Sequence, residues 1–172
     1  LMTASLARLL RQSISNEDEV VPLAREVEYA KGYLTIQKMR YKDKLEFEID
    51  VEPSILNIPL IKLVLQPIIE NAIYHGLKYK ESKGLLQVKG FMKDGNAVLQ
   101  VIDNGVGMDE ETLSHIYDKH KVNYHSNGVG VYNVQKRLKL YYGENYGITY
   151  ESEKGVGTTA TITIPGIQEE SI

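Results

Sequence analysis

The sequence contains no cysteine and no tryptophan, and it has only two phenylalanines against twelve tyrosines. Without cysteine the chain can form neither disulfides nor thiolate metal sites, a composition typical of proteins in a reducing compartment. There is no run of about 18 apolar residues and no signal-peptide pattern. The sequence therefore predicts no membrane span and no export segment, and we expect a cytoplasmic domain.

An excess of basic residues is also lacking. The 20 lysines and arginines are outnumbered by 23 aspartates and glutamates, which gives a net charge of −3. Because a nucleic-acid surface needs a basic patch or stripe, we expect no nucleic-acid partner. The length of 172 residues, with 42% apolar residues, suits one globular domain that buries its own core.

The first half of the chain shows helical and strand periodicities in turn. Leucines and isoleucine at helical spacing predict a helix over residues 1–14, and a second helix is expected from about Pro22 to Tyr41. Strict alternation predicts a strand over 45–51. A further helix is expected to begin near Pro59, and Pro67 must kink or restart it because proline lacks the N–H donor.

The second half contains the signals of a hairpin, a helix and two more strands. Residues 109–127 are weakly periodic and indicate a short helix followed by a mobile loop. Together the signals favour an α+β fold in which helices cover a mixed, largely antiparallel sheet in two layers. The expected elements are strands at about 85–93 and 97–103 around the turn Asp94-Gly95-Asn96, a helix at about 129–142, and strands at about 147–152 and 158–164.

Three polar residues on the helix before residue 76 are candidates for chemistry. The side-chain oxygen of Asn71 is a neutral, hard ligand that suits Mg²⁺ when phosphates supply the charge. Its neighbour Glu70 could orient waters on the metal or assist a transfer, or it could be a solvated helical carboxylate. One turn further on, His75 could touch a phosphate or simply end the helix.

Asp103 ends a strand of alternating apolar residues and is followed by a glycine-rich turn. Its carboxylate can accept a hydrogen bond from an exocyclic amine, while Gly105 and Gly107 let a base approach the backbone. The composition Asp-Asn-Gly is also common in ordinary turns. The position of Asp103, 32 residues after Asn71 and before two more glycine turns, favours the binding role.

Two later glycine turns could surround phosphates. Gly128-Val129-Gly130 precedes a predicted helix whose first amides would face an anion, although it could equally be a hinge. In Gly155-Val156-Gly157-Thr158, the Thr158 hydroxyl could reach an adenine or Asp103, or the segment could be a plain hairpin. Weaker candidates are the phosphate partners Lys119, Lys121 and Arg137, and a zinc site formed by His115, His120 and His125, whose five-residue spacing is unfavourable.

The order of these motifs resembles the N, G1, G2 and G3 boxes of the superfamily that unites gyrase, heat-shock chaperones, histidine kinases and mismatch-repair ATPases. Two runs narrow the resemblance to sensor histidine kinases of the LytS/YesM type. They are Leu65-Gln66-Pro67-Ile68-Ile69-Glu70-Asn71-Ala72-Ile73-Tyr74-His75-Gly76 and Asn133-Val134-Gln135-Lys136-Arg137-Leu138. The similarity extends over essentially residues 20–165.

The resemblance implies a Bergerat-type ATP-binding sandwich at 20–166, preceded by the end of a dimerisation helix and a linker at 1–19 and followed by a tail at 167–172. It places Asn71 on magnesium and Asp103 on the adenine amino group. Glu70 would act with Asn71 in catalysis. The remaining nucleotide-binding residues would be His75, Gly105, Gly107, Gly128, Gly130, Gly157 and Thr158.

In function, the resemblance implies a kinase that uses ATP and Mg²⁺ to phosphorylate a histidine of its dimerisation domain, and then a response regulator receiver domain. The parent would be a homodimer in the cell membrane. The family's His-Phe-x-x-Asn acceptor segment is absent from these residues. Hydrolytic relatives carry a glutamate base where this chain has Pro67, which favours a kinase over an ATPase clamp. A partner-binding module without nucleotide is the third alternative.

Overall fold

The computed structural model describes residues 19–116 and 128–166. The helix expected over residues 1–14 lies outside this part of the chain, as do residues 117–127 of the short helix and loop expected over 109–127, so the first helix and the loop stay predictions.

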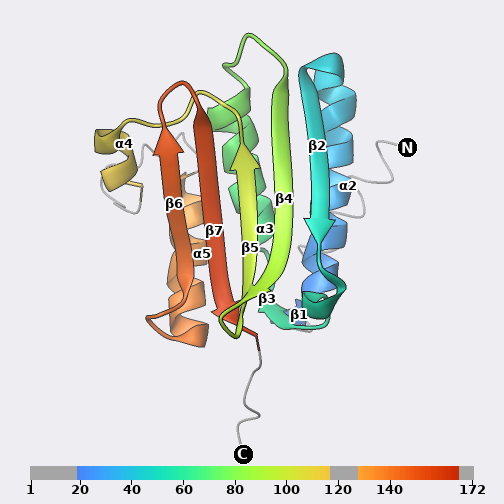
Figure 1. Cartoon of the computed structure of the whole chain (residues 1–172), viewed down its shortest axis with the longest axis vertical. Coiled ribbons are helices and arrows are strands. Elements are labelled where there is room, and N and C mark those ends of the chain that lie inside the picture. Colours follow the sequence, from blue (N-terminus) through green and yellow to red (C-terminus); the bar gives the residue numbers. More distant parts are fainter. Residues whose placement is uncertain (1–18, 117–127, 167–172) are drawn as a thin grey trace, which may run out of the picture.

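A mixed five-stranded sheet forms one layer of the molecule (Figure 1). Its strand order is β2-β4-β5-β7-β6, and only the pair β2–β4 is parallel. The predicted α+β class with a largely antiparallel sheet is therefore confirmed. The strands are β2 (Leu45–Val51), β4 (Gly84–Lys93), β5 (Asn96–Asp103), β6 (Gly147–Glu153) and β7 (Gly157–Pro165).

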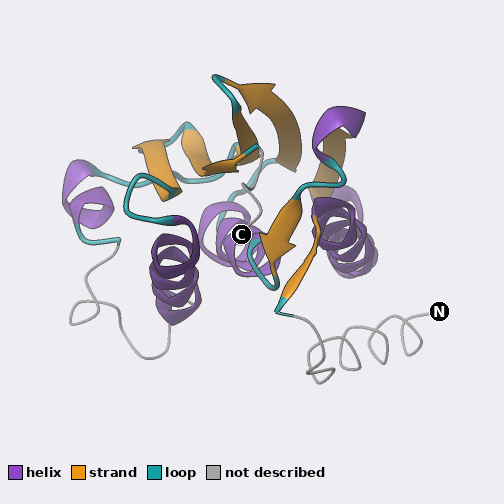
Figure 2. Cartoon of the chain, turned by 90° about the horizontal axis from the view of Figure 1, so that it is seen from below, coloured by secondary structure: helices purple, strands orange, loops and turns teal. Residues whose placement is uncertain are grey.

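The longer helices cover one face of this sheet, as the view in Figure 2 shows. In Figure 1, α2 lies behind β2, α3 behind β4 and β5, and α5 behind β6 and β7. These helices span Leu23–Tyr41 (α2), Leu65–Asn71 (α3) and Gly128–Tyr142 (α5). Shorter elements are the helix α4 (Glu110–Ser114), the π-helical turn η3 (Ala72–Leu77), and the 3₁₀ turns η1 (Lys42–Lys44) and η2 (Pro53–Ile55).

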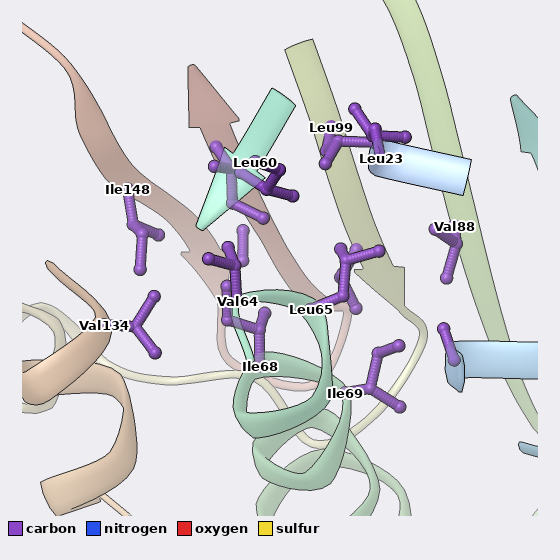
Figure 3. Packing of buried hydrophobic residues seen from close by; sticks show 14 of the residues in the cluster. Leu23, Leu60, Val64, Leu65, Ile68, Ile69, Val88, Leu99, Val134 and Ile148 are labelled. Atoms are coloured by element: carbon purple, nitrogen blue, oxygen red, sulfur yellow. The ribbon is translucent and has the colours of Figure 1, made fainter. Parts of the chain in front are cut away.

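The core lies between the two layers (Figure 3). Strands of period two turn alternate residues inward, so Leu86 and Val88 of β4 are fully buried against the helices. From the helical side, α3 buries Leu65, Ile68 and Ile69 completely. Each such side chain stabilises the fold by about 1.5–3 kcal/mol, which fixes α3 at the centre of the molecule.

The prediction of a helix that begins near Pro59 is wrong for the residues before Leu65. Residues Pro59–Ile61 form a short strand, β3, that pairs antiparallel with β1 (Val20–Pro22). Helix α3 begins only at Leu65, so Pro67 falls in its first turn, where the missing N–H needs no helical partner. The proline therefore starts the helix without kinking it.

The hairpin prediction is confirmed. Asp94 and Gly95 have φ values of 51° and 78°, as expected for the turn that suits strand twist, and Asn96 already belongs to β5.

Two side chains of α5 form hydrogen bonds that join this helix to β3 and β6. The Tyr142 hydroxyl accepts a hydrogen bond from the Ile61 amide and donates one to the Pro59 carbonyl, both at 3.2 Å. The Gln135 amide accepts from the Ile148 N–H at 2.6 Å and donates to the Ile148 carbonyl at 3.4 Å. The side chain of Gln135 thus occupies the open edge of β6 as a neighbouring strand would.

Candidate functional site

A cavity of about 570 Å³ opens between the α3–η3 segment and the ends of β5 and β7, and α4 flanks it. It brings together five of the nucleotide-binding residues expected from the sequence: Asn71, His75, Asp103, Gly107 and Thr158. Its other lining residues are Ile68, Ala72, Gly76, Val101, Met108, Glu111, Thr112, His115, Ile116, Val131, Tyr150 and Ala160.

Asp103 is the buried acid of this cavity. It is the last residue of β5, pairs with Thr158 of β7, and is only 5% exposed. Its Oδ1 accepts a hydrogen bond from the Gly105 amide at 2.8 Å. Burial raises the pKa of Asp103 to about 6, against the opposing effect of the Gly105 and Thr158 amides and the Lys80 charge. At neutral pH the side chain is therefore mostly an ionised acceptor.

The residues around Asp103 hold the end of β5 in place. Asn104 extends the pairing with β4, since its amide donates to the Leu85 carbonyl at 3.2 Å and its Oδ1 accepts from the Leu85 amide at 2.8 Å. The ammonium of Lys80 donates to the Asn104 carbonyl, which brings a positive charge near Asp103. Lys80 was not predicted from the sequence, because nothing in its local pattern places it beside Asn104.

The loop after Asp103 is fixed on both sides. On one side, the Val106 amide donates to the Gly76 carbonyl at 3.0 Å. On the other, the Val106 carbonyl accepts from Gly155 at 2.7 Å. Gly107 has a φ of 63°, and a Cβ there would stand 1.9 Å from the Glu153 carbonyl oxygen. Only glycine fits this position.

Close backbone contact also joins this loop to η3. A Cβ on Gly105 would stand 2.3 Å from the Gly76 carbonyl group, and a Cβ on Gly76 would stand 2.7 Å from Asp103 Oδ1. Gly76, which the sequence analysis quoted only as part of a run, is thus packed directly against the buried acid.

The α3–η3 segment supplies the amide and the imidazole of the cavity. Asn71 is the last residue of α3, and His75 lies in the π-helical turn that follows, a type of turn often found at functional sites. Burial, and then the charge of Lys78, lowers the pKa of His75, so its imidazole is neutral at neutral pH. Glu70 is not among the lining residues, and its Oε1 accepts from the Gln66 amide at 2.9 Å.

Thr158 is held by a residue that the sequence analysis missed. Its hydroxyl lies 2.8 Å from that of Ser152, the residue opposite it on β6. The Ser152 hydroxyl also accepts from the Met108 amide at 2.8 Å and donates to the Gly157 carbonyl at 3.0 Å. Ser152 thereby joins the last hairpin to the loop that follows Asp103.

Helix α4 contributes residues that were not assigned to a nucleotide site from the sequence. Asp109 caps it by accepting from the Thr112 amide at 3.0 Å and hydroxyl at 2.6 Å. These bonds, with that from Lys154, lower the pKa of Asp109 to about 2. The helix presents Glu111, Thr112 and His115 to the cavity.

The remaining candidates lie off the cavity or outside the described residues. Gly128 and Gly130 belong to the first turn of α5, where a Cβ on Gly130 would meet that of Pro67 at 3.4 Å, and Gly157 begins β7. Arg137 lies on α5 and does not line the cavity. Residues 19–116 and 128–166 contain no metal-binding group of three His, Cys, Asp or Glu. Lys119, Lys121, His120 and His125 fall in the undescribed segment.

This fold and cavity define a nucleotide-binding ATPase domain, and sequence comparison agrees. Residues 57–168 match the family described as histidine kinase-, DNA gyrase B- and HSP90-like ATPase, and residues 1–45 match the histidine kinase family. The chain belongs to the histidine kinase-, DNA gyrase B- and HSP90-like ATPase family.

Similar proteins include sensor histidine kinases. Sensor histidine kinase YesM of Bacillus subtilis is 33% identical over 95% of this chain and 27% of its own length. Sensor protein LytS of Oceanobacillus iheyensis is 34% identical over 81% of this chain and 24% of its own length. The chain thus spans about a quarter of the length of these relatives.

Solved structures show the same fold. The catalytic domain of histidine kinase ThkA aligns with a TM-score of 0.66 at 14% identity, covering 87% of this chain and 99% of that one. The histidine kinase domain of the blue-light activated kinase of Erythrobacter litoralis aligns with a TM-score of 0.59 at 18% identity, covering 86% and 63%. The predicted Bergerat sandwich is therefore confirmed. No helix within residues 19–116 and 128–166 has the length and apolarity to cross a bilayer.

Proposed function

We propose that this chain is the ATP-binding catalytic domain of a sensor histidine kinase. It binds ATP with Mg²⁺ and transfers the γ-phosphoryl group to a histidine of a dimerisation domain. The observation that supports this most is the meeting of Asp103 and Asn71, 32 residues apart in the chain, in one cavity of about 570 Å³.

The Asp103 end of the cavity suits an adenine. The volume lies within the range of about 300–1,000 Å³ that small-molecule sites occupy. An ionised carboxylate is acceptor-only and therefore selects an amino group over a carbonyl. The neighbouring lining residues Val101 and Ala160 offer apolar surface to a flat base.

The Asn71 end suits phosphates with a magnesium ion. A neutral amide oxygen leaves charge balance to the phosphates, as is usual for Mg²⁺ held with few protein ligands. The neutral imidazole of His75 can donate one hydrogen bond to a phosphate oxygen. When bound, the metal would neutralise phosphate charge, while Asn71 and His75 orient the triphosphate.

Transfer to an imidazole is favoured over hydrolysis. At residue 67, where hydrolytic relatives carry a glutamate base, this chain has a proline in the first turn of α3. An acceptor imidazole attacks as a neutral nucleophile and needs no such base. The domain then contributes positioning and charge neutralisation.

The partners belong to the same proposal. Two observations support the proposed partners. The relatives are named sensor histidine kinase and sensor protein, and residues 1–45 match the histidine kinase family. We propose that the acceptor histidine lies in a dimerisation domain of the parent, a homodimer in the cell membrane. A response regulator receiver domain would then take the phosphoryl group.

Calorimetric titration with a non-hydrolysable ATP analogue, with and without Mg²⁺, tests the binding step. We expect Asp103→Asn to lower affinity at least tenfold in both conditions, because an amide offers one acceptor in place of two. We expect Asn71→Ala to remove the gain in affinity that Mg²⁺ gives the parent. Matched controls are Asp50→Asn and Asn133→Ala, both at exposed positions.

Two results would contradict the proposed roles. One is an affinity of Asp103→Asn within twofold of the parent. The other is an Asn71→Ala variant whose affinity still rises with Mg²⁺ as the parent's does.

A further inference from the structure

Glu26 is a buried carboxylate that does not line the cavity. It lies on α2 between Leu23 and Ala30 and is only 2% exposed. Buried carboxylates are costly unless they are paired or hydrogen-bonded, so the partners of this side chain indicate its role.

Those partners are three consecutive backbone amides, two just before α3 and one at its first residue. Glu26 Oε1 accepts from Leu63 at 2.8 Å, and Oε2 accepts from Val64 at 2.9 Å and Leu65 at 3.0 Å. These amides have no acceptor within their own helix, and the positive end of the helix dipole favours a carboxylate there. Glu26 thus caps a helix that is not its own.

The cap also holds a strained backbone. Leu63 has a φ of 59°, a value that L-residues rarely adopt and that its surroundings must enforce. The hydrogen bond to Oε1 is one contact that holds Leu63 in this conformation, directly before α3 begins.

Helix α3 connects this cap directly to the cavity. Asn71 is the last residue of α3, about 9 Å along the axis from Leu65 at 1.5 Å per residue. The charge of Glu70, beside Asn71 at that end of α3, is also among the causes that raise the pKa of Tyr33 on α2 to about 12, after burial. Helices α2 and α3 pack against each other.

The cap joins two parts of the chain that match different families. Glu26 lies in residues 1–45, which match the histidine kinase family, and its three donors lie in residues 57–168, which match the ATPase family. The hydrogen bonds of Glu26 therefore link the two matched parts of the chain.

We infer that Glu26 is a positioning residue for the phosphate end of the cavity: it holds α2 onto the beginning of α3 and so sets where Asn71 stands. The inference rests on the proposed function, because it takes Asn71 to be the magnesium ligand. Asp103 lies on β5 and meets the α3–η3 segment at Gly76, five residues further from the cap than Asn71. Loss of the cap therefore affects magnesium and phosphate binding more than base binding.

The test compares two affinities in the same variants. Binding of an ATP analogue with and without Mg²⁺ reports the Asn71 end, and binding of adenosine reports the Asp103 end. For Glu26→Ala we expect the magnesium-dependent gain to fall at least tenfold and adenosine affinity to stay within twofold of the parent. Glu26→Gln keeps an acceptor for two of the three amides. We expect its magnesium-dependent gain in affinity to fall about threefold.

Two controls separate positioning from general destabilisation. Glu28→Gln removes a charge from an exposed position of the same helix and should match the parent. Ile164→Ala lowers stability from the core at the other end of β7 from Thr158, and it should keep the magnesium-dependent gain. Hydrogen exchange of residues 63–73 without nucleotide should accelerate in Glu26→Ala by more than the variant's loss of global stability explains, whereas in Ile164→Ala it should follow the global stability.

The outcomes are distinct. If both Glu26 variants keep the magnesium-dependent gain within twofold of the parent, Glu26 does not position Asn71. A fall in adenosine affinity equal to the fall in magnesium-dependent binding would assign Glu26 a purely structural role and overturn the inference. Should Glu26→Ala fail to fold, Glu26→Gln decides the question alone. If the parent itself shows no magnesium-dependent ATP binding, the proposed function fails and this inference with it.

Discussion

Replacing Asp103 by asparagine should stabilise the empty protein while it weakens nucleotide binding. The carboxylate is 5% exposed, and its pKa rises from an ordinary 3.8 to about 6. The folded state therefore binds the proton more tightly than the unfolded state. As pH rises from about 4 to about 6, the unfolded state ionises first and the free energy of unfolding falls.

The size of this effect follows from the pKa. A rise from 3.8 to about 6 corresponds to about 3 kcal/mol of lost stability once the pH is well above 6. Asparagine carries no charge, so it avoids this loss. It also places an N–H₂ group where the carboxylate accepts from a backbone amide, which costs about 1 kcal/mol. We expect Asp103→Asn to be about 1–3 kcal/mol more stable than the parent at pH 7.5.

Urea denaturation without nucleotide at pH 7.5 and pH 5 measures the difference. At pH 5 the parent's Asp103 is already mostly protonated, so the gain in stability should shrink. The reasoning is refuted if Asp103→Asn is the less stable protein at pH 7.5, or if the gap is the same at both pH values. Asp50→Asn, at an exposed position, serves as the charge control. A gain in stability with a loss of binding would mark Asp103 as a group kept for function.

Two further substitutions test the scaffold around the cavity. Gly107→Ala should lower the free energy of unfolding by about 2 kcal/mol or more in urea denaturation, because its Cβ would stand 1.9 Å from the Glu153 carbonyl oxygen. Gly95→Ala, also at positive φ but with no atom within 4 Å of its Cβ, should cost clearly less, and equal losses would contradict the steric argument. Tyr142→Phe leaves the Ile61 amide without its hydroxyl acceptor and should cost about 1 kcal/mol, whereas an unchanged midpoint would show that the contact contributes nothing.

Local sequence patterns predicted most of the elements but not the start of α3. Alternation identified β2, and the Asp94-Gly95 turn identified the β4–β5 hairpin, because both signals are local. The run after Asn57 has apolar residues at helical spacing, yet Pro59–Ile61 is a strand. A three-residue strand exists only through its partner β1, and no local pattern reports that pairing.

The sequence predicted the motifs of the candidate site, but it did not predict the residues that hold those motifs in place. The order of motifs singled out Asn71, Asp103 and Thr158, and all three line one cavity of the structure. Ser152 and Lys80 were missed, because their roles arise from contacts between distant segments. The sequence did contain a signal for Glu26 that was not used. It is a charged residue on the apolar face of the helix predicted from about Pro22 to Tyr41.

Phosphoryl transfer in trans tests the central claim most directly. The chain would be incubated with labelled ATP, Mg²⁺ and a separately made dimerisation segment that carries the acceptor histidine, beside Asp103→Asn as the binding-deficient control. We predict acid-labile, base-stable label on that segment with the parent chain and at most a trace with the variant. Release of phosphate without label on the segment, from a chain that binds ATP, would contradict the kinase assignment and favour an ATPase.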